Sequence, residues 1–139
     1  MALVGSVTRT DTAEFYGMRK IKLAWTCTAG GAVSGFLLGV TRGMIRKMVT
    51  IPAGGGSAPS DNYDITLLDD EGADVLNGRG ADRDTANIEQ VCPGVTCTDG
   101  TSPTSVPVAV ASDLQLVIAS AGASKSGTIV LYIESNIAR

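Results

Sequence analysis

Histidine is absent from this 139-residue sequence, and aromatic residues (4%) and charged residues (18%) are scarce. Without histidine the chain lacks the commonest general base, the commonest metal ligand and the usual pH switch. Serine and threonine are plentiful, but no histidine or suitably placed lysine is available to activate them as nucleophiles. The sequence therefore predicts no enzyme activity, no catalytic residues and no cofactor.

The three cysteines, Cys27, Cys92 and Cys97, cannot all pair within one chain. Cys92 and Cys97 are close enough in sequence to close a small disulfide loop. Nothing marks the chain as secreted, so reduced thiols are the favoured alternative. A zinc site would need further ligands, and neither histidine nor a second cysteine pair supplies them. We expect no bound metal.

No apolar run approaches the ~20 residues that a membrane-spanning helix needs. The N-terminus, MALVGSVTRTD, lacks the pattern of a signal peptide. These features predict a soluble protein without a membrane partner. The net charge of −3 argues against nucleic acid as the main partner, because binding to phosphates needs a basic patch.

What the sequence does contain is small and aliphatic: 17 glycines and 44% hydrophobic residues, with turn signals between short alternating segments. About eight or nine such segments follow one another at the spacing typical of β-sandwiches. The sequence thus predicts a single all-β domain over residues 1–139. We expect an antiparallel β-sandwich or jelly roll, with a small β-barrel as the alternative.

The segment 62–97 is expected to form the centre of this domain. It contains a strand at 63–68, an acidic turn at 69–72, a short apolar strand at Val75-Leu76 and a turn at Asn77-Gly78. Another strand is predicted at 88–91. Strands joined by acidic and Asn-Gly turns are typical of an antiparallel unit, around which the two flanks would fold.

In the N-terminal flank, a first strand is expected at 3–10 and the clearest alternation covers 18–28. One face of the latter is apolar and includes Trp25, and the other carries Lys20 and Lys22. Trp25 is predicted to anchor the core, with a role at an interface as the alternative.

Two further strands are predicted at 33–41 and 44–51, separated by a turn at Arg42-Gly43. In the second, Ile45, Val49 and Ile51 would face inward and Arg46, Met48 and Thr50 outward. Lys47 interrupts the inner face, which indicates an edge strand. A helix over 42–50 is the competing interpretation, but Gly43 and Pro52 leave room for barely two turns. Residues 52–60 form a flexible loop.

In the C-terminal flank, Pro107 indicates an edge strand around 106–110. Segments 113–119 and 128–135 are expected to pair as a hairpin. The predicted core consists of Ile21, Leu23, Trp25, Phe36, Leu38, Val49, Ile65, Leu67, Leu116, Ile118, Ile129 and Leu131.

One cluster of carboxylates stands out, comprising Asp69, Asp70, Glu71, Asp74, Asp82 and Asp84. A calcium ion takes six to eight oxygen ligands, often from alternate positions of a loop. The order DDEGADVLNG does not match that of an EF-hand loop. A solvated acidic turn is therefore favoured over a calcium site.

The stretch NYDITLLDDEGADVLNGRGADRDTAN and the closing GTIVLYIE resemble segments of small structural proteins from tailed bacteriophages. The resemblance covers roughly residues 61–134 and carries over no individual functional residue. It implies a head decoration or cement protein that bridges capsid subunits on the capsid surface after assembly in the host cytoplasm. Its partners would be the major capsid protein or other virion proteins. The alternatives are a tail, neck or fibre component, or a receptor- or carbohydrate-binding β module.

The mean hydropathy of +0.20 is high for a soluble protein. It indicates apolar surface that is buried between subunits. We expect a homo-oligomer, with a trimer matching the local three-fold positions of an icosahedral lattice. The N-terminal arm 1–17 and the tail 135–139 are the segments expected to reach a neighbour.

Overall fold

The computed structural model describes residues 2–95 and 104–135, and in these residues the regular structure is almost entirely β. A single 3-10 turn, Gly55–Ser57, lies in the loop predicted at 52–60. The all-β prediction is confirmed. The described strands are β1 Ser6–Phe15, β2 Met18–Thr26, β3 Val33–Pro52, β4 Asp64–Leu68, β5 Glu89–Val91, β6 Gly94–Val95, β7 Thr104–Ser105, β8 Val108–Ala119 and β9 Ser126–Glu134.

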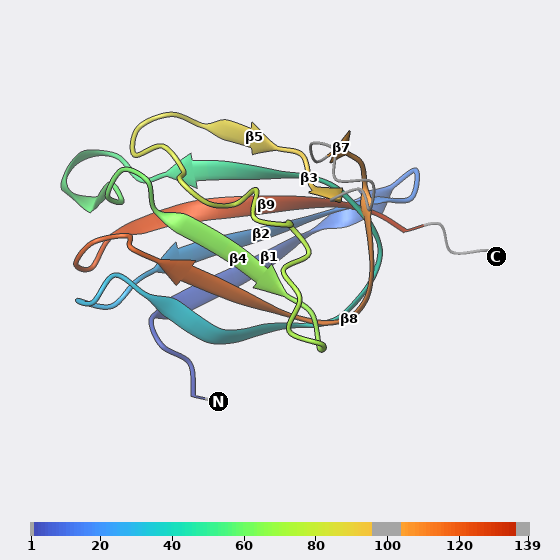
Figure 1. Ribbon diagram of the computed structural model, residues 1–139, viewed down its shortest axis with the longest axis horizontal. Coiled ribbons are helices and arrows are strands. Elements are labelled where there is room, and N and C mark those ends of the chain that lie inside the picture. The colour runs from blue at the N-terminus through green and yellow to red at the C-terminus, as the bar shows by residue number, and fades with distance from the viewer. Residues whose placement is uncertain (1, 96–103, 136–139) are drawn as a thin grey trace.

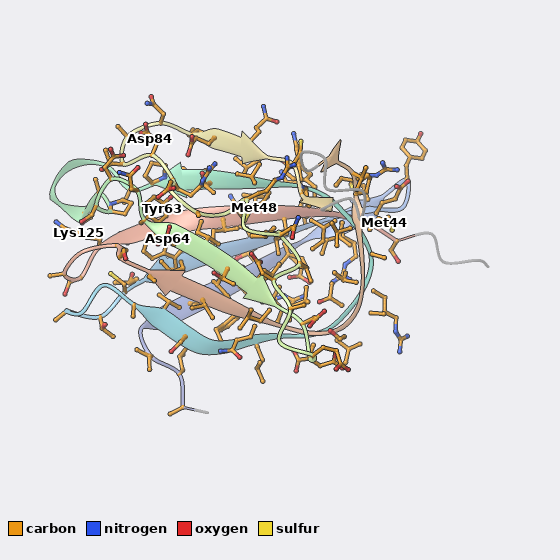
Figure 2. The ribbon with its side chains drawn as sticks, in the orientation of Figure 1. Met44, Met48, Tyr63, Asp64, Asp84 and Lys125 are labelled. Carbon is orange, nitrogen blue, oxygen red and sulfur yellow. The ribbon has the colours of Figure 1, made fainter. Side chains whose placement is uncertain are left out.

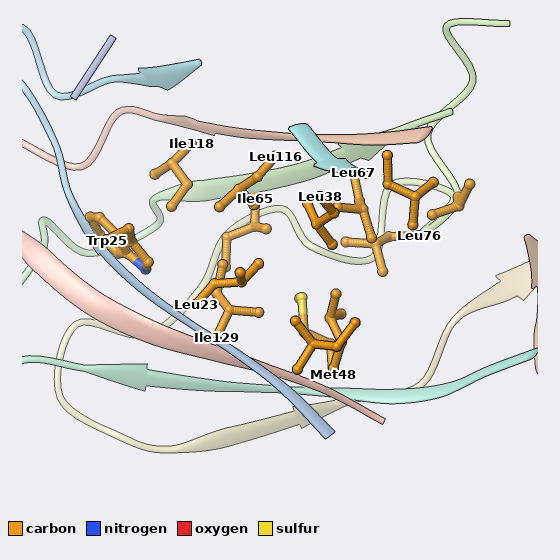
Figure 3. Close-up of a cluster of buried hydrophobic side chains, with 14 of the residues drawn as sticks. Leu23, Trp25, Leu38, Met48, Ile65, Leu67, Leu76, Leu116, Ile118 and Ile129 are labelled. Atoms are coloured by element: carbon orange, nitrogen blue, oxygen red, sulfur yellow. The ribbon is translucent and has the colours of Figure 1, made fainter. Parts of the chain in front are cut away.

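Seven strands form one antiparallel sheet in the order β1-β2-β9-β3-β8-β4, with β5 pairing to β3 (Figure 1). The remaining pair, β6 and β7, forms a small separate ladder. The long strand β3 pairs with β8 along its first half and with β9 and β5 along its second half. The sheet folds over along β3, so β4 and β8 lie across the core from β2 and β9 (Figure 3). This sandwich-like arrangement supports the predicted class, and the jelly-roll order stays a prediction.

The interior of β3 departs most from the sequence analysis. The prediction of a turn at Arg42-Gly43 was wrong, because β3 runs unbroken through both residues. Gly43 has φ 134°, and a Cβ there would lie 2.4 Å from the carbonyl oxygen of Glu134 on β9. Glycine at this position therefore allows two strands to approach closely rather than turning the chain.

A register shift explains the other predictions for β3 that were wrong. The pairing with β9 slips between Ile45 and Lys47, so the side chains after this point change faces. Met48 and Thr50 are buried, whereas Val49 is only partly buried and is not a core residue. The predicted edge strand was also wrong, since this half of β3 pairs on both sides.

The segment 62–97 is not the antiparallel unit that we expected. Strands β4 and β5 pair with β8 and β3 respectively and not with each other. Val75 and Leu76 are buried, but they lie in turns and form no strand. The long strand β3, rather than this segment, is the element that contacts most of the sheet.

Two further pairings differ from prediction. Strands β8 and β9 do not form a hairpin, because β3 lies between them. The segments predicted around 106–110 and at 113–119 are one continuous strand, β8. The prediction that residues 1–17 form an arm free to reach a neighbour was also wrong, since Ser6–Phe15 pairs with β2 as strand β1. Of the tail 135–139, only Ser135 lies in the described part of the chain, and it is buried.

The core contains ten of the twelve predicted residues, and Figure 3 shows many of them between the two layers. Phe36 packs against its margin. Trp25 lies in the core, as predicted, and its ring centroid is 5.7 Å from that of Tyr63. A Cβ on Gly127 would lie 2.9 Å from the indole, so glycine leaves room for this large side chain. The core thus joins β2 to the residue that precedes β4 through an aromatic contact as well as aliphatic ones.

Candidate interaction surfaces

The loop that follows β4 folds back along the outer edge of that strand. Ile65 N donates to Gly80 O at 2.9 Å, and Val75 N donates to Leu67 O at 2.8 Å. A Cβ on Gly80 would lie 2.1 Å from the carbonyl oxygen of Ile65, so only glycine fits this approach. The loop takes the place of a neighbouring strand, and this edge of the sheet is covered rather than open.

Asp74 holds this loop in place through its carboxylate. Its Oδ1 accepts hydrogen bonds from the backbone N–H groups of Leu67 at 3.2 Å and Leu76 at 3.0 Å. Its Oδ2 accepts one from Gly78 N at 2.8 Å. Asn77 and Gly78 both have positive φ, which confirms the turn predicted for this pair. One carboxylate therefore fixes both the turn and its attachment to β4.

Other carboxylates of the predicted cluster bind backbone in the same way. Asp84 Oδ1 accepts hydrogen bonds from Ala86 N at 2.6 Å and Asn87 N at 2.7 Å, and these bonds hold its pKa below the usual value. Asp69 Oδ1 accepts from the N–H groups two and four residues later. The cluster lies in the loops between β4 and β5, and three of its six carboxylates, those of Asp69, Asp74 and Asp84, organise loop backbone.

In residues 2–95 and 104–135, no three side chains of Asp, Glu, His or Cys are grouped so that they could hold a metal. Cys27 is buried, and its Sγ lies 3.0 Å from Gly122 O and 3.2 Å from Lys125 N. Cys92 is exposed. Cys97, its possible disulfide partner, lies outside the described residues.

Four exposed apolar side chains come from two segments that meet near the start of β1 and β3. Val4 and Ser34 exchange two backbone hydrogen bonds of 2.8 and 3.1 Å. Leu3 lies just before Val4 in one segment, and Leu37 and Val40 follow Ser34 in the other. Of these side chains, Leu37 is 57% exposed and Val40 is 67% exposed. We call Leu3, Val4, Leu37 and Val40 the apolar seam. Exposed apolar side chains that come from adjoining segments indicate a contact surface.

The outward side of β2, β9 and the second half of β3 is basic. We call Lys20, Lys22, Arg46 and Lys47 the basic face. On β9, Tyr132 lies between two lysines, with Lys20 Nζ 5.6 Å and Lys47 Nζ 4.8 Å from its ring centroid. Lys47 Nζ also donates to Gln90 Oε1 at 2.7 Å. Among the described residues of this face, the only carboxylate is Glu134, which accepts a hydrogen bond from Arg46 Nε at 2.7 Å.

The sequence predicted only part of the basic face. Lys20 and Lys22 were expected outside, and they are. Lys47 was expected on the inner face, but the register shift after Ile45 turns it outward beside Tyr132. No signal in the sequence marks the position of that shift.

Farther along the same side lies a shallow hollow of about 360 Å³. Its lining is rich in hydroxyl groups and includes Ser6, Thr8, Thr26, Ser126 and Thr128. No exposed aromatic side chain lines it, because the indole of Trp25 packs into the core. The hollow offers hydrogen-bonding groups without the stacking surface that sugar rings favour.

Within the described part of the chain, no helix is long and apolar enough to cross a membrane. No family model, no curated protein and no solved structure matches this chain.

Proposed function

We propose that this protein is a structural component of a virus particle, a decoration protein that sits on the head and bridges capsid subunits. The proposal rests on the sequence resemblance to phage virion proteins together with one structural observation. That observation is the apolar seam, whose side chains are exposed on a well-packed domain. Apolar side chains left in water on such a domain are typical of a surface that another subunit covers.

The use of the acidic residues supports a structural role. Asp74, Asp84 and Asp69 accept hydrogen bonds from backbone N–H groups, so they stabilise loops. A rigid domain with fixed loops suits a protein whose work is to hold neighbours in register. As a homo-oligomer, and as a trimer in particular, it would match the local three-fold positions of a capsid lattice.

The test is to add purified protein to particles of the parent virus that lack it. We expect the double variant Leu37→Asp, Val40→Asp to lose binding at least tenfold, because two charges would enter the contact. Ile88→Asp is the matched control, since Ile88 is 64% exposed and lies outside the seam. Equal binding by the seam variant and the control would refute the seam as the contact.

Cryo-electron microscopy of the complete particle tests the location. Density for this domain over the capsid subunits supports the decoration role. Density at the neck, tail or fibre would instead select that alternative. Absence of the domain from the particle would refute a structural role in the virion.

A carbohydrate- or receptor-binding module is the second candidate, and the hydroxyl-lined hollow is the observation that favours it. This alternative predicts saturable binding of a glycan by the isolated protein. Replacement of Thr128 by valine should then weaken that binding, because it removes a hydroxyl and keeps the shape. Absence of binding across a glycan array would count against the module.

A further inference from the structure

One peptide bond of this chain is suited to a spontaneous chemical change. Among the four asparagines of the sequence, only Asn77 is followed by glycine. Because glycine has no Cβ, the backbone nitrogen of Gly78 can approach the side-chain carbonyl carbon of Asn77 with little hindrance. Both residues are exposed, so water and hydroxide can reach them. The pair is therefore a candidate site for deamidation.

The reaction needs only the chain and water. Gly78 N loses its proton to base in the solvent and forms a bond to Asn77 Cγ, while the bond from Cγ to Nδ2 breaks and ammonia leaves. Water then opens the cyclic imide at either ring carbonyl. The product is aspartate or isoaspartate, which carries a new negative charge, and isoaspartate also adds a carbon atom to the backbone.

In the folded loop, the attacking nitrogen is already hydrogen-bonded. Gly78 N donates to Asp74 Oδ2 at 2.8 Å, and Asn77 N donates to Asp74 O at 2.9 Å. The other carboxylate oxygen of Asp74 accepts from Leu67 N at 3.2 Å and Leu76 N at 3.0 Å, so Asp74 is itself held against β4. The turn is thus fixed at both of its central residues.

We propose that Asn77-Gly78 is a modification site that the folded protein keeps unreactive, and that the carboxylate of Asp74 is the group responsible. A carboxylate is too weak a base to take a proton from a backbone amide, so Asp74 does not assist the attack. Its negative charge beside Gly78 N instead favours the protonated amide over the anion that attacks. The hydrogen bond must also break before the nitrogen can turn toward Asn77 Cγ, and bonds to a charged acceptor are strong.

The site matters for the fold because it lies where the loop covers the edge of β4. Ile65 N donates to Gly80 O at 2.9 Å, two residues beyond the site. An isoaspartate at position 77 would displace Gly78 N from Asp74, because the backbone becomes longer there. The cover over β4 would then loosen, and an uncovered strand edge can pair with other chains. Asp74 therefore protects this edge from a chemical change as well as holding the loop over it.

Mass spectrometry of peptides from the incubated full chain measures the reaction at position 77. The folded parent should react at least about tenfold more slowly than the same chain unfolded in guanidinium chloride, because a hydrogen bond to a charged group must break first. Asp74→Ala should bring the rate of the folded protein close to that of the unfolded chain. Asp74→Asn removes the charge and keeps one oxygen, so it should react at an intermediate rate, and it replaces Asp74→Ala if circular dichroism shows that variant to be unfolded.

Leu23→Ala is the matched control. Leu23 is buried on β2, so its truncation should destabilise the fold to a similar extent while Asp74 stays in place. The control should modify Asn77 at the rate of the folded parent. A rate as high as that of Asp74→Ala would show that global unfolding exposes the site, and would overturn the proposal.

Three other results would overturn the proposal as well. They are a folded parent that reacts as fast as the unfolded chain, an unfolded chain that stays unmodified, and Asp74 variants that both react at the parent rate. The inference does not rest on the virion role, because the reaction needs no partner. Absence of the protein from the particle would leave this site in place, and an unprotected site would leave the virion role in place.

Discussion

Asp74 offers the sharpest test of how the loop closes the edge of β4. Replacement by alanine removes one acceptor from three backbone N–H groups, those of Leu67, Leu76 and Gly78. A hydrogen bond to a charged group contributes about 1.5–3 kcal/mol, and water replaces part of this where the N–H is near solvent. We therefore expect Asp74→Ala to lower the free energy of unfolding by about 2–4 kcal/mol, a large share of the roughly 5–15 kcal/mol typical of a domain.

Urea unfolding monitored by the fluorescence of Trp25 measures this loss. Asp74→Asn keeps one oxygen acceptor but replaces the other carboxylate oxygen with an amide group that cannot accept a hydrogen bond, so we expect about half the loss of stability. Asp70→Ala is the matched control, because the exposed Asp70 lies in the same loop. If Asp74→Ala and Asp70→Ala lose the same stability, the carboxylate does not hold the loop.

Three other perturbations test separate parts of the fold. Gly43→Ala should cost about 3 kcal/mol more than Gly39→Ala in urea unfolding, because both residues have positive φ but only Gly43 faces a close neighbour, Glu134 O. Because the pKa of Asp84 is lowered in the folded protein, its carboxylate stabilises the fold above the unfolded-state pKa of about 4, and this stability is lost as the pH falls through the folded-state pKa. The urea midpoint should therefore fall less on acidification in Asp84→Asn than in the parent, and an unchanged pH profile would contradict this. Burial raises the pKa of Tyr63 to about 12, so the stability that its neutral phenol contributes is present below about pH 10 and is lost as the pH rises toward 12. Tyr63→Phe should therefore reduce the loss of stability at alkaline pH, and an equal loss in both proteins would contradict the assignment.

The parts of the fold that the sequence could predict are those with an uninterrupted local period. Strand β2 alternates without a break, so the burial of Ile21, Leu23 and Trp25 follows directly. The strand at β4 is predictable for the same reason. Period-two alternation reports which face is buried, and it does so only while the register is constant.

The parts that could not be predicted depend on pairing between distant segments. The register shift after Ile45 has no marker in the sequence, yet it exchanges the faces of Lys47, Met48 and Val49. The insertion of β3 between β8 and β9 likewise depends on which strands meet in space. A hairpin between consecutive strands is the commonest local solution, and here tertiary packing overrides it.

The candidate surfaces, too, could be predicted where they depend on local sequence and not where they depend on contacts between distant segments. The positions of the acidic residues in turns were predictable from composition. The bonds of Asp74 to backbone were not predicted, although an aspartate shortly before Asn77-Gly78 is a usable signal for a side chain that stabilises a turn. The apolar seam required the contact between Val4 and Ser34, which lie thirty residues apart in the sequence.

The twenty-residue strand β3 has a consequence for how this domain opens. Because it is hydrogen-bonded to β8 in one layer and to β9 and β5 in the other, neither layer can separate while β3 stays in place. The central amides of β3 should therefore exchange with solvent deuterium only through global unfolding, at rates set by the full free energy of unfolding. A single strand that belongs to both layers makes the domain one cooperative unit, so a pull on either outer surface is resisted by the whole of it.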